Sequence, residues 1–174
     1  MSFFKDERKR ISDGYHKFLI GIALFFYFIQ IQSEVSYNKV LLKNSDKVIS
    51  VSFISEILII GIVFLIFYLS EKLFWIKEQG QKVFIIRKYD SIPISKKEIY
   101  SSKFKVIIYN SLIFMFGAMI IYIGTLIFNS YFNVNVVKDI FSTIKFSLFT
   151  IILIMIVFTI NIFEDYRSKV KNNK

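Results

Sequence analysis

The 174-residue chain contains no cysteine, one histidine (His16) and one proline (Pro93). Without cysteine it can form neither disulfides nor thiolate metal sites, and a single histidine excludes a metal centre built from several histidines. The sequence also lacks a Ser-His-Asp set, a glycine-rich phosphate loop and a pair of acids spaced for catalysis. We therefore expect no enzymatic activity and no cofactor.

Apolar residues are abundant instead: they make up 55% of the chain, and the mean hydropathy is +0.54. They occur in long blocks, and a block of about 20 apolar residues is long enough to cross a bilayer as a helix. The sequence predicts an all-α fold, with residues 1–174 forming a single membrane domain around a polar loop at 74–104. The four predicted spans cover about residues 15–33, 51–73, 105–128 and 142–163.

The first apolar block is the weakest, because Gln30 and Gln32 interrupt its outer end. A cleaved signal peptide is the alternative interpretation of such a block. However, the sequence Gln-Ser-Glu-Val-Ser-Tyr that follows Ile31 offers a poor cleavage site. This favours a retained span.

Positive charge is unevenly distributed along the chain, whose formal net charge is +10. The N-terminal segment, the loop between the second and third blocks and the C-terminal tail hold 18 of the 23 lysines and arginines. Because loops rich in lysine and arginine stay on the cytoplasmic side, both termini and this loop are predicted to be inside. The charge thus indicates topology rather than nucleic-acid binding. The composition, rich in Ile, Phe, Lys, Asn and Tyr, suggests a bacterial cytoplasmic membrane.

The loop between the second and third blocks is the soluble segment with the clearest local signals. We expect its first part to continue the second helix to near Gly80, with Trp75 in the headgroup zone. Pro93 cannot donate a backbone hydrogen bond and biases Ile92 towards extended structure, so the helix should break at 92–94. Ser95 and Glu98 have the spacing of a capping box, which predicts a new helix from about Lys96 into the third span.

This capping signal is open to two interpretations: a turn that merely starts a helix, or part of a binding element. The stretch Ile92-Pro93-Ile94-Ser95-Lys96-Lys97-Glu98-Ile99, followed by Ser102-Lys103-Phe104, resembles a segment of bacterial type-two ABC exporter permeases. In that family the segment lies between the second and third spans, near the contact with the ATPase subunit. The resemblance implies a partner-docking loop that contains Pro93, Ser95, Lys96, Lys97 and Glu98.

The chain also departs from that family, whose members usually have six spans. Asp6-Glu7-Arg8, just before the first span, is similar to the same region of several small, uncharacterised four-span bacterial proteins. Two hypotheses follow. The chain is either a permease-like subunit that needs an ABC ATPase, a second membrane subunit or its own oligomer, or a non-transporting four-helix protein with an immunity or regulatory role.

Polar residues inside a bilayer are costly and mark places to look for function. Glu56 and Lys145 lie near the outer ends of their spans, where they can pair or reach the headgroups separately. Asn110, Ser111 and Asn161 lie at similar depth and are expected to hydrogen-bond between helices. We also expect close helix contacts at three small residues, Gly61, Gly117 and Ala118. His16, at a membrane boundary, has no evident partner.

Overall fold

The structure, a computed structural model of the whole chain, describes residues 3–44, 50–78, 81–84, 95–131 and 134–172. These residues form mostly helix, with one pair of short strands. In chain order the elements are α1 (Phe3–Ile11), α2 (Gly14–Lys43), α3 (Glu56–Phe74), β1 (Trp75–Glu78), β2 (Gln81–Phe84), α5 (Lys96–Phe128) and α6 (Val136–Asn172).

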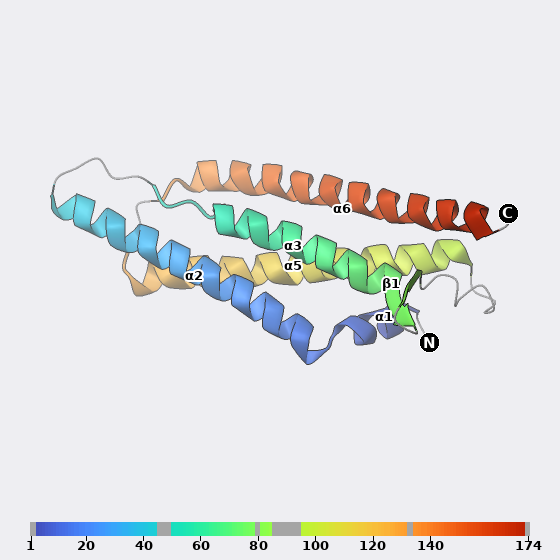
Figure 1. Cartoon of the computed structure of the whole chain (residues 1–174). Coiled ribbons are helices and arrows are strands. Elements are labelled where there is room, and N and C mark those ends of the chain that lie inside the picture. The colour runs from blue at the N-terminus through green and yellow to red at the C-terminus, as the bar shows by residue number, and fades with distance from the viewer. Residues whose placement is uncertain (1–2, 45–49, 79–80, 85–94, 132–133, 173–174) are drawn as a thin grey trace.

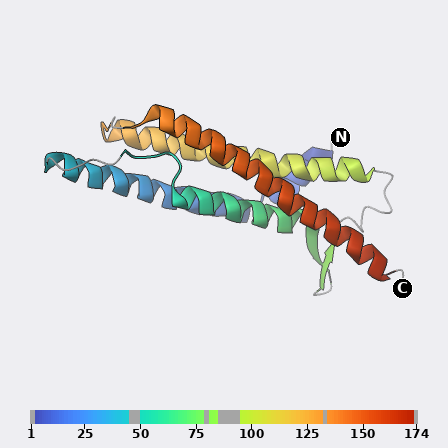
Figure 2. The same ribbon diagram turned by 90° about the horizontal axis from the view of Figure 1, so that it is seen from above.

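Four helices, α2, α3, α5 and α6, are long and apolar enough to cross a membrane. They run along a common direction, as Figure 1 shows, and α6 crosses the others obliquely in the view of Figure 2. Helices α3 and α5 pack against each other, and each also contacts both α2 and α6. The described chain therefore forms a bundle with α3 and α5 at its centre.

Both ends of the described chain lie at the same end of this bundle (Figure 1). We call it the hairpin end, because it also holds strands β1 and β2, together with α1 and the start of α5. The opposite end, where α2 ends and α6 begins, is the far end. Four long helices that alternate in direction return the chain to the end at which it began, which accounts for this placement.

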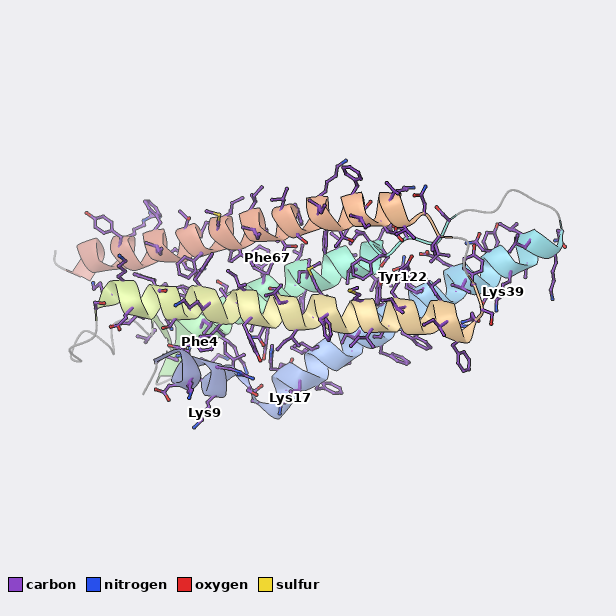
Figure 3. All side chains as sticks on the ribbon, turned by 180° about the vertical axis from the view of Figure 1, so that it is seen from behind. Phe4, Lys9, Lys17, Lys39, Phe67 and Tyr122 are labelled. Carbon is purple, nitrogen blue, oxygen red and sulfur yellow. The ribbon has the colours of Figure 1, made fainter. Side chains whose placement is uncertain are left out.

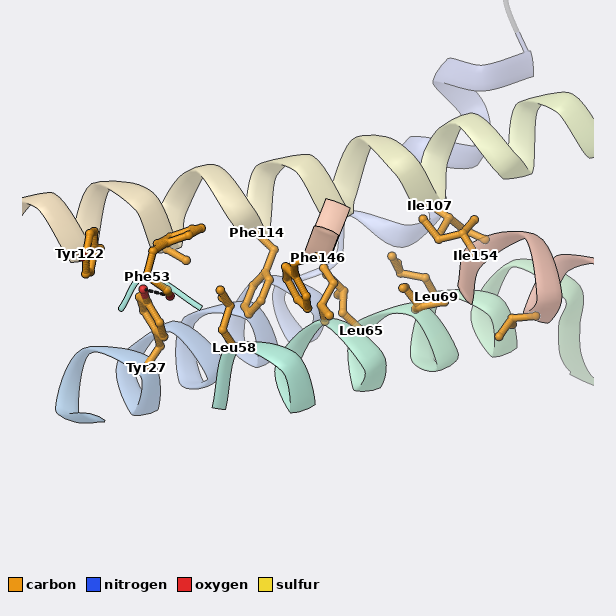
Figure 4. Packing of buried hydrophobic residues seen from close by; sticks show 14 of the residues in the cluster. Tyr27, Phe53, Leu58, Leu65, Leu69, Ile107, Phe114, Tyr122, Phe146 and Ile154 are labelled. Atoms are coloured by element: carbon orange, nitrogen blue, oxygen red, sulfur yellow. Dashed lines mark hydrogen bonds between the residues drawn. The ribbon is translucent and has the colours of Figure 1, made fainter. Parts of the chain in front are cut away.

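Large apolar side chains fill the centre of the bundle. Leu58, Ile62 and Ile66 of α3 have no exposed surface, and Phe114 of α5 is 1% exposed. Figure 4 draws Leu58, Phe114 and Phe146, which belong to one cluster of buried apolar residues, so that α3, α5 and α6 all contribute to this core. Association of helices in a bilayer depends on such van der Waals packing, because lipid is as apolar as the side chains themselves.

The second apolar block was expected to be helical from Val51, but α3 begins at Glu56. Ser55 adopts an extended conformation, and its side chain accepts a hydrogen bond from the backbone N–H of Leu58. Two of the preceding carbonyls accept hydrogen bonds from side chains of other helices: Tyr122 Oη of α5 donates to Val51 O at 3.1 Å, and Tyr27 Oη of α2 donates to Phe53 O at 2.8 Å. These bonds hold residues 51–55 in a non-helical conformation. They join residues far apart in the chain, so the local sequence does not predict them.

The prediction that this helix continues to near Gly80 is also wrong. Helix α3 ends at Phe74, and β1 pairs with β2 as an antiparallel hairpin in which Trp75 faces Phe84. The rings of Trp75 and Phe84 lie 4.5 Å apart in an edge-on contact. Aromatic and β-branched cross-strand pairs stabilise such strands, and Ile76 opposite Val83 adds a second.

The other helices extend beyond the predicted spans. Helix α2 continues ten residues past the predicted end at residue 33, and α6 includes all of 142–163 with extensions on both sides. Helix α5 confirms the predicted start at Lys96 and runs without a break into the third span. The short helix α1 was not predicted; it packs against α5 and α3 at the hairpin end.

Candidate functional site

The predicted docking segment lies at the hairpin end, where α5 begins. Ser95, in an extended conformation, caps α5, and its hydroxyl accepts a hydrogen bond from the Glu98 backbone N–H at 3.2 Å. Ser95, Lys96, Lys97 and Glu98 are all exposed. Pro93 and the expected break at 92–94 lie outside the described residues. Four of the five predicted docking residues are therefore accessible at one helix start.

A group of buried charges holds this end of the bundle together. Lys103, which has no exposed surface, donates from Nζ to Glu7 Oε1 at 2.8 Å and to the Leu73 carbonyl at 2.6 Å. Arg10 lies 3.0 Å from Glu7 Oε2 and donates to the carbonyls of Lys72 and Leu73, each at 2.9 Å. We call Glu7, Arg10, Lys103 and these two carbonyls the Lys103 cluster.

The Lys103 cluster compensates two local costs. The last carbonyls of a helix have no partner within that helix and carry partial negative charge, so two cations at the end of α3 stabilise it. A buried charge is costly unless it is paired and hydrogen-bonded, which Glu7 and Leu73 provide for Lys103. The cluster thereby joins α1, α3 and α5, which are far apart in sequence.

A second ion pair lies next to this cluster, at the turn between α1 and α2. Asp13 caps α2 by accepting the His16 backbone N–H at 2.7 Å, and its other carboxylate oxygen is bonded to Lys72 Nζ of α3. The hydrogen bond from Lys72, together with that from the His16 backbone, holds the pKa of Asp13 below its usual value. The charged carboxylate therefore anchors the start of α2 to the end of α3.

His16 has partners, contrary to the sequence expectation. Its side chain is buried, its Nε2 lies 3.0 Å from Asn110 Oδ1, and its ring stacks on that of Tyr68. Asn110 Nδ2 donates to the Val106 carbonyl, so its oxygen is the acceptor and His16 Nε2 carries the proton. Nδ1 of His16 has no hydrogen-bond partner among the described residues.

The other predicted interhelical contacts are present in part. Asn161 of α6 donates to the Ser70 hydroxyl of α3 at 2.6 Å, as expected. Ser111 is buried, and its hydroxyl has no hydrogen-bond partner in the described chain. Glu56 and Lys145 are both exposed and form no ion pair with each other, so the first of the two alternatives, a Glu56–Lys145 pair, is not present in the structure.

The small residues are at close contacts, as expected. A Cβ atom on Gly61 would lie 2.8 Å from Phe114 Cζ, and one on Gly117 would lie 3.0 Å from Leu24 Cδ1. Ala118 is fully buried. These positions allow α3 to approach α5, and α5 to approach α2, more closely than larger side chains permit.

The far end has its own polar network, which sequence reasoning missed. Asp139 of α6 accepts hydrogen bonds from Tyr122 Oη at 2.7 Å, from the Ser52 hydroxyl at 3.1 Å and from the Phe53 backbone N–H at 3.4 Å. The neighbouring bond from Tyr27 to Phe53 is drawn in Figure 4. This network fixes the non-helical segment before α3 against α5 and α6.

The polar side chains of the Lys103 cluster, the Asp13–Lys72 pair and the Asp139 network form their bonds with one another, and they do not surround an open binding site. The described residues include no set of three or more His, Asp or Glu side chains placed to hold a metal ion. The side chains of Ser95, Lys97 and Glu98 at the hairpin end, in contrast, are exposed on the surface of the bundle. Exposed side chains of this kind are suited to binding through their charge and shape.

Comparisons of the chain with protein-family models, curated proteins and solved structures gave no match.

Proposed function

We propose that this chain is a multi-pass protein of a bacterial cytoplasmic membrane, with α2, α3, α5 and α6 crossing the bilayer. Large apolar side chains on the outer faces of these helices support the proposal: Phe25, Phe67, Phe116 and Ile152 are each more than half exposed. Such surface is costly in water and suited to lipid. The excess of lysine and arginine in the segments at the hairpin end supports a cytoplasmic location for that end.

We further propose that the chain acts as a permease-like subunit whose segment Ser95–Glu98 docks onto an ABC ATPase. The observation that carries this proposal is the continuity of α5, a single helix of 33 residues. Its exposed first turn is the proposed docking element, and its following residues form the centre of the bundle. Through a continuous helix, a partner that pushes on Lys96 and Lys97 acts directly on the packed core.

The packed centre of the bundle means that transport by this chain would require a further membrane subunit. Leu58, Ile66 and Phe114 fill the space between the central helices. A passage for a substrate would have to form between this chain and a neighbour. Transport therefore requires a second membrane subunit or further copies of the chain.

The test is co-purification with the ABC ATPase encoded nearest to this chain in its genome. The variant Lys96→Glu/Lys97→Glu/Glu98→Lys should lose the ATPase, because it inverts the exposed charges without changing the Ser95 cap. The matched control is Lys138→Glu/Lys145→Glu at the far end, which should retain it. Equal recovery of the ATPase by the docking variant would contradict the docking proposal.

The alternative is a non-transporting membrane protein with an immunity or regulatory role, and the packed centre of the bundle favours it. On this hypothesis no ATPase co-purifies even with the unmodified chain. The same experiment thus separates the two functions, provided that recovery of the unmodified chain from the membrane fraction is verified first.

A further inference from the structure

Helix α1 presents two different faces at the hairpin end. Glu7 and Ile11 are buried against the bundle, whereas Lys5, Arg8 and Lys9 are exposed. In Figure 3, Phe4 lies on the side of α1 nearest α5, and Lys9 lies on the opposite side. Because Glu7 is bound to the buried Lys103, the exposed cations of α1 are held in place on the bundle.

Four exposed cations belong to α5 and to the two helices that contact it near its start: Arg8 and Lys9 of α1, Lys17 of α2 and Lys105 of α5. We call them the basic collar. The Arg8 guanidinium lies 4.4 Å from the centre of the Tyr109 ring, and Tyr109 is one helical turn from Lys105. No carboxylate among the described residues forms an ion pair with any of the four.

Exposed apolar surface begins directly beside the basic collar. On α5, Lys105, Tyr109, Leu112 and Phe116 follow one another at the three- and four-residue spacing of a single helix face. Leu112 and Phe116 are 61% and 66% exposed. On α2, Lys17 is followed at once by Phe18, which is 62% exposed. Cations therefore border an apolar surface. This arrangement complements an anionic phospholipid, in which a negative headgroup adjoins hydrocarbon chains.

We propose that the basic collar binds the phosphate of an anionic phospholipid, whose acyl chains lie along the apolar faces of α5 and α2. The cations attract the negative headgroup, and the amphipathic ring of Tyr109 lies at the boundary between charge and apolar surface that tyrosine prefers. The apolar surface favours a lipid over a soluble phosphate, because a soluble phosphate would leave that surface uncovered.

The other exposed lysines of the hairpin end are less suited to this role. Lys96 and Lys97 precede Lys105 on α5 by eight or nine residues, which places them roughly 12–14 Å further from the apolar surface. They belong to the docking segment proposed above. The lipid inference rests on the proposed membrane crossing but is independent of ATPase docking.

The test uses the full chain reconstituted in phosphatidylcholine membranes that contain trace spin-labelled phosphatidylglycerol or phosphatidylcholine. Electron paramagnetic resonance gives the fraction of each labelled lipid held against the protein. We expect phosphatidylglycerol to associate more strongly than phosphatidylcholine by about threefold or more. In the variant Arg8→Gln/Lys17→Gln/Lys105→Gln this ratio should approach one.

The matched control is Lys77→Gln/Lys96→Gln/Lys97→Gln, which removes the same charge from the same end and should keep the preference. Circular dichroism checks that each variant retains its helices, and Lys17→Gln/Lys105→Gln, which leaves α1 unchanged, should already reduce the ratio. The inference is overturned if the collar variants keep the preference, if the control loses it equally, or if inorganic phosphate at matched ionic strength abolishes it. Failure of the membrane-crossing proposal is distinguishable, because neither labelled lipid would then be held.

Discussion

Lys103 carries its charge with no exposed surface, between Glu7 of α1 and the last carbonyls of α3. Two charges removed from solvent are stabilising only as a complete pair, since loss of one leaves the other without compensation. Arg10 donates to the same carbonyls, but it is itself a cation, so Glu7 is the side chain that neutralises Lys103.

Changing Glu7→Gln should therefore destabilise the hairpin end by about 3–5 kcal/mol, because it leaves the Lys103 ammonium buried without a counter-charge. Thermal loss of helix, followed by circular dichroism in detergent, measures this effect. Asp6→Asn is the matched control, since Asp6 is the exposed neighbouring acid and its loss should have little effect. In the double variant Glu7→Leu/Lys103→Met much of the loss should be recovered; no difference between Glu7→Gln and Asp6→Asn would refute this account of the cluster.

Sequence reasoning found some of these residues and missed others for a physical reason. Ser95 and Glu98 were found because capping is a contact between residues three positions apart. The pairing of His16 with Asn110 joins residues 94 positions apart, which no local pattern specifies. Lys103 did leave a trace: it stands four residues after Ile99 and four before Ile107, on the buried stripe of α5.

At the scale of the elements, some helices of the bundle pack closely at a glycine residue, which has no side chain. At Gly61 the ring of Phe114 occupies the space in which a Cβ atom would lie, so that α3 and α5 are in contact there. Gly21 of α2, in contrast, has no atom within 4 Å of such a Cβ position. The two glycines differ in what surrounds them and not in their helical conformation.

The substitution Gly61→Ala should cost about 1–3 kcal/mol, because the buried Phe114 ring must move to admit the methyl group. Gly21→Ala should be neutral or slightly stabilising, because alanine favours helix and meets no neighbour. Thermal unfolding in detergent compares the two variants with the unmodified chain. If both alanines have the same effect, the contact at Gly61 is not tight.

At the level of elements, helices with long apolar blocks were predictable and the hairpin was not. The residues from Glu71 to Glu78 contain good helix formers, so the local sequence continues α3 without a stop signal. The pairing of Trp75 with Phe84 overrides that preference, and it becomes visible only when both strands are placed together. The late start of α3 has the same origin, since Tyr27 and Tyr122 bind the carbonyls before it.

For the whole molecule, the arrangement of the helices places the two described ends of the chain together, while the side of the membrane that they occupy is part of our proposal. Single cysteines can report that side without interference, because the chain has no cysteine of its own. Suitable exposed positions occur at both ends of the bundle: Ser12 and Ser101 near the hairpin end, and Ser36 and Asn135 near the far end.

In intact cells, a membrane-impermeant maleimide should label Ser36→Cys and Asn135→Cys but not Ser12→Cys or Ser101→Cys. After the cells are opened, all four should react, which shows that each thiol is accessible. Labelling of Ser12→Cys or Ser101→Cys from outside would show that the orientation is the reverse of the one proposed. The docking segment and the basic collar would then face away from any cytoplasmic ATPase and from the inner leaflet.

The Lys103 cluster also has a consequence for biosynthesis. Glu7 and Lys103 are separated by 96 positions, so α1 leaves the ribosome long before its counter-charge has been made. During that interval Glu7 has Arg10 of the same helix as its ion-pair partner, but Lys103 has not yet been made. Lys103 is available only after α5 has been made, so α1 can complete its contacts with the bundle only then.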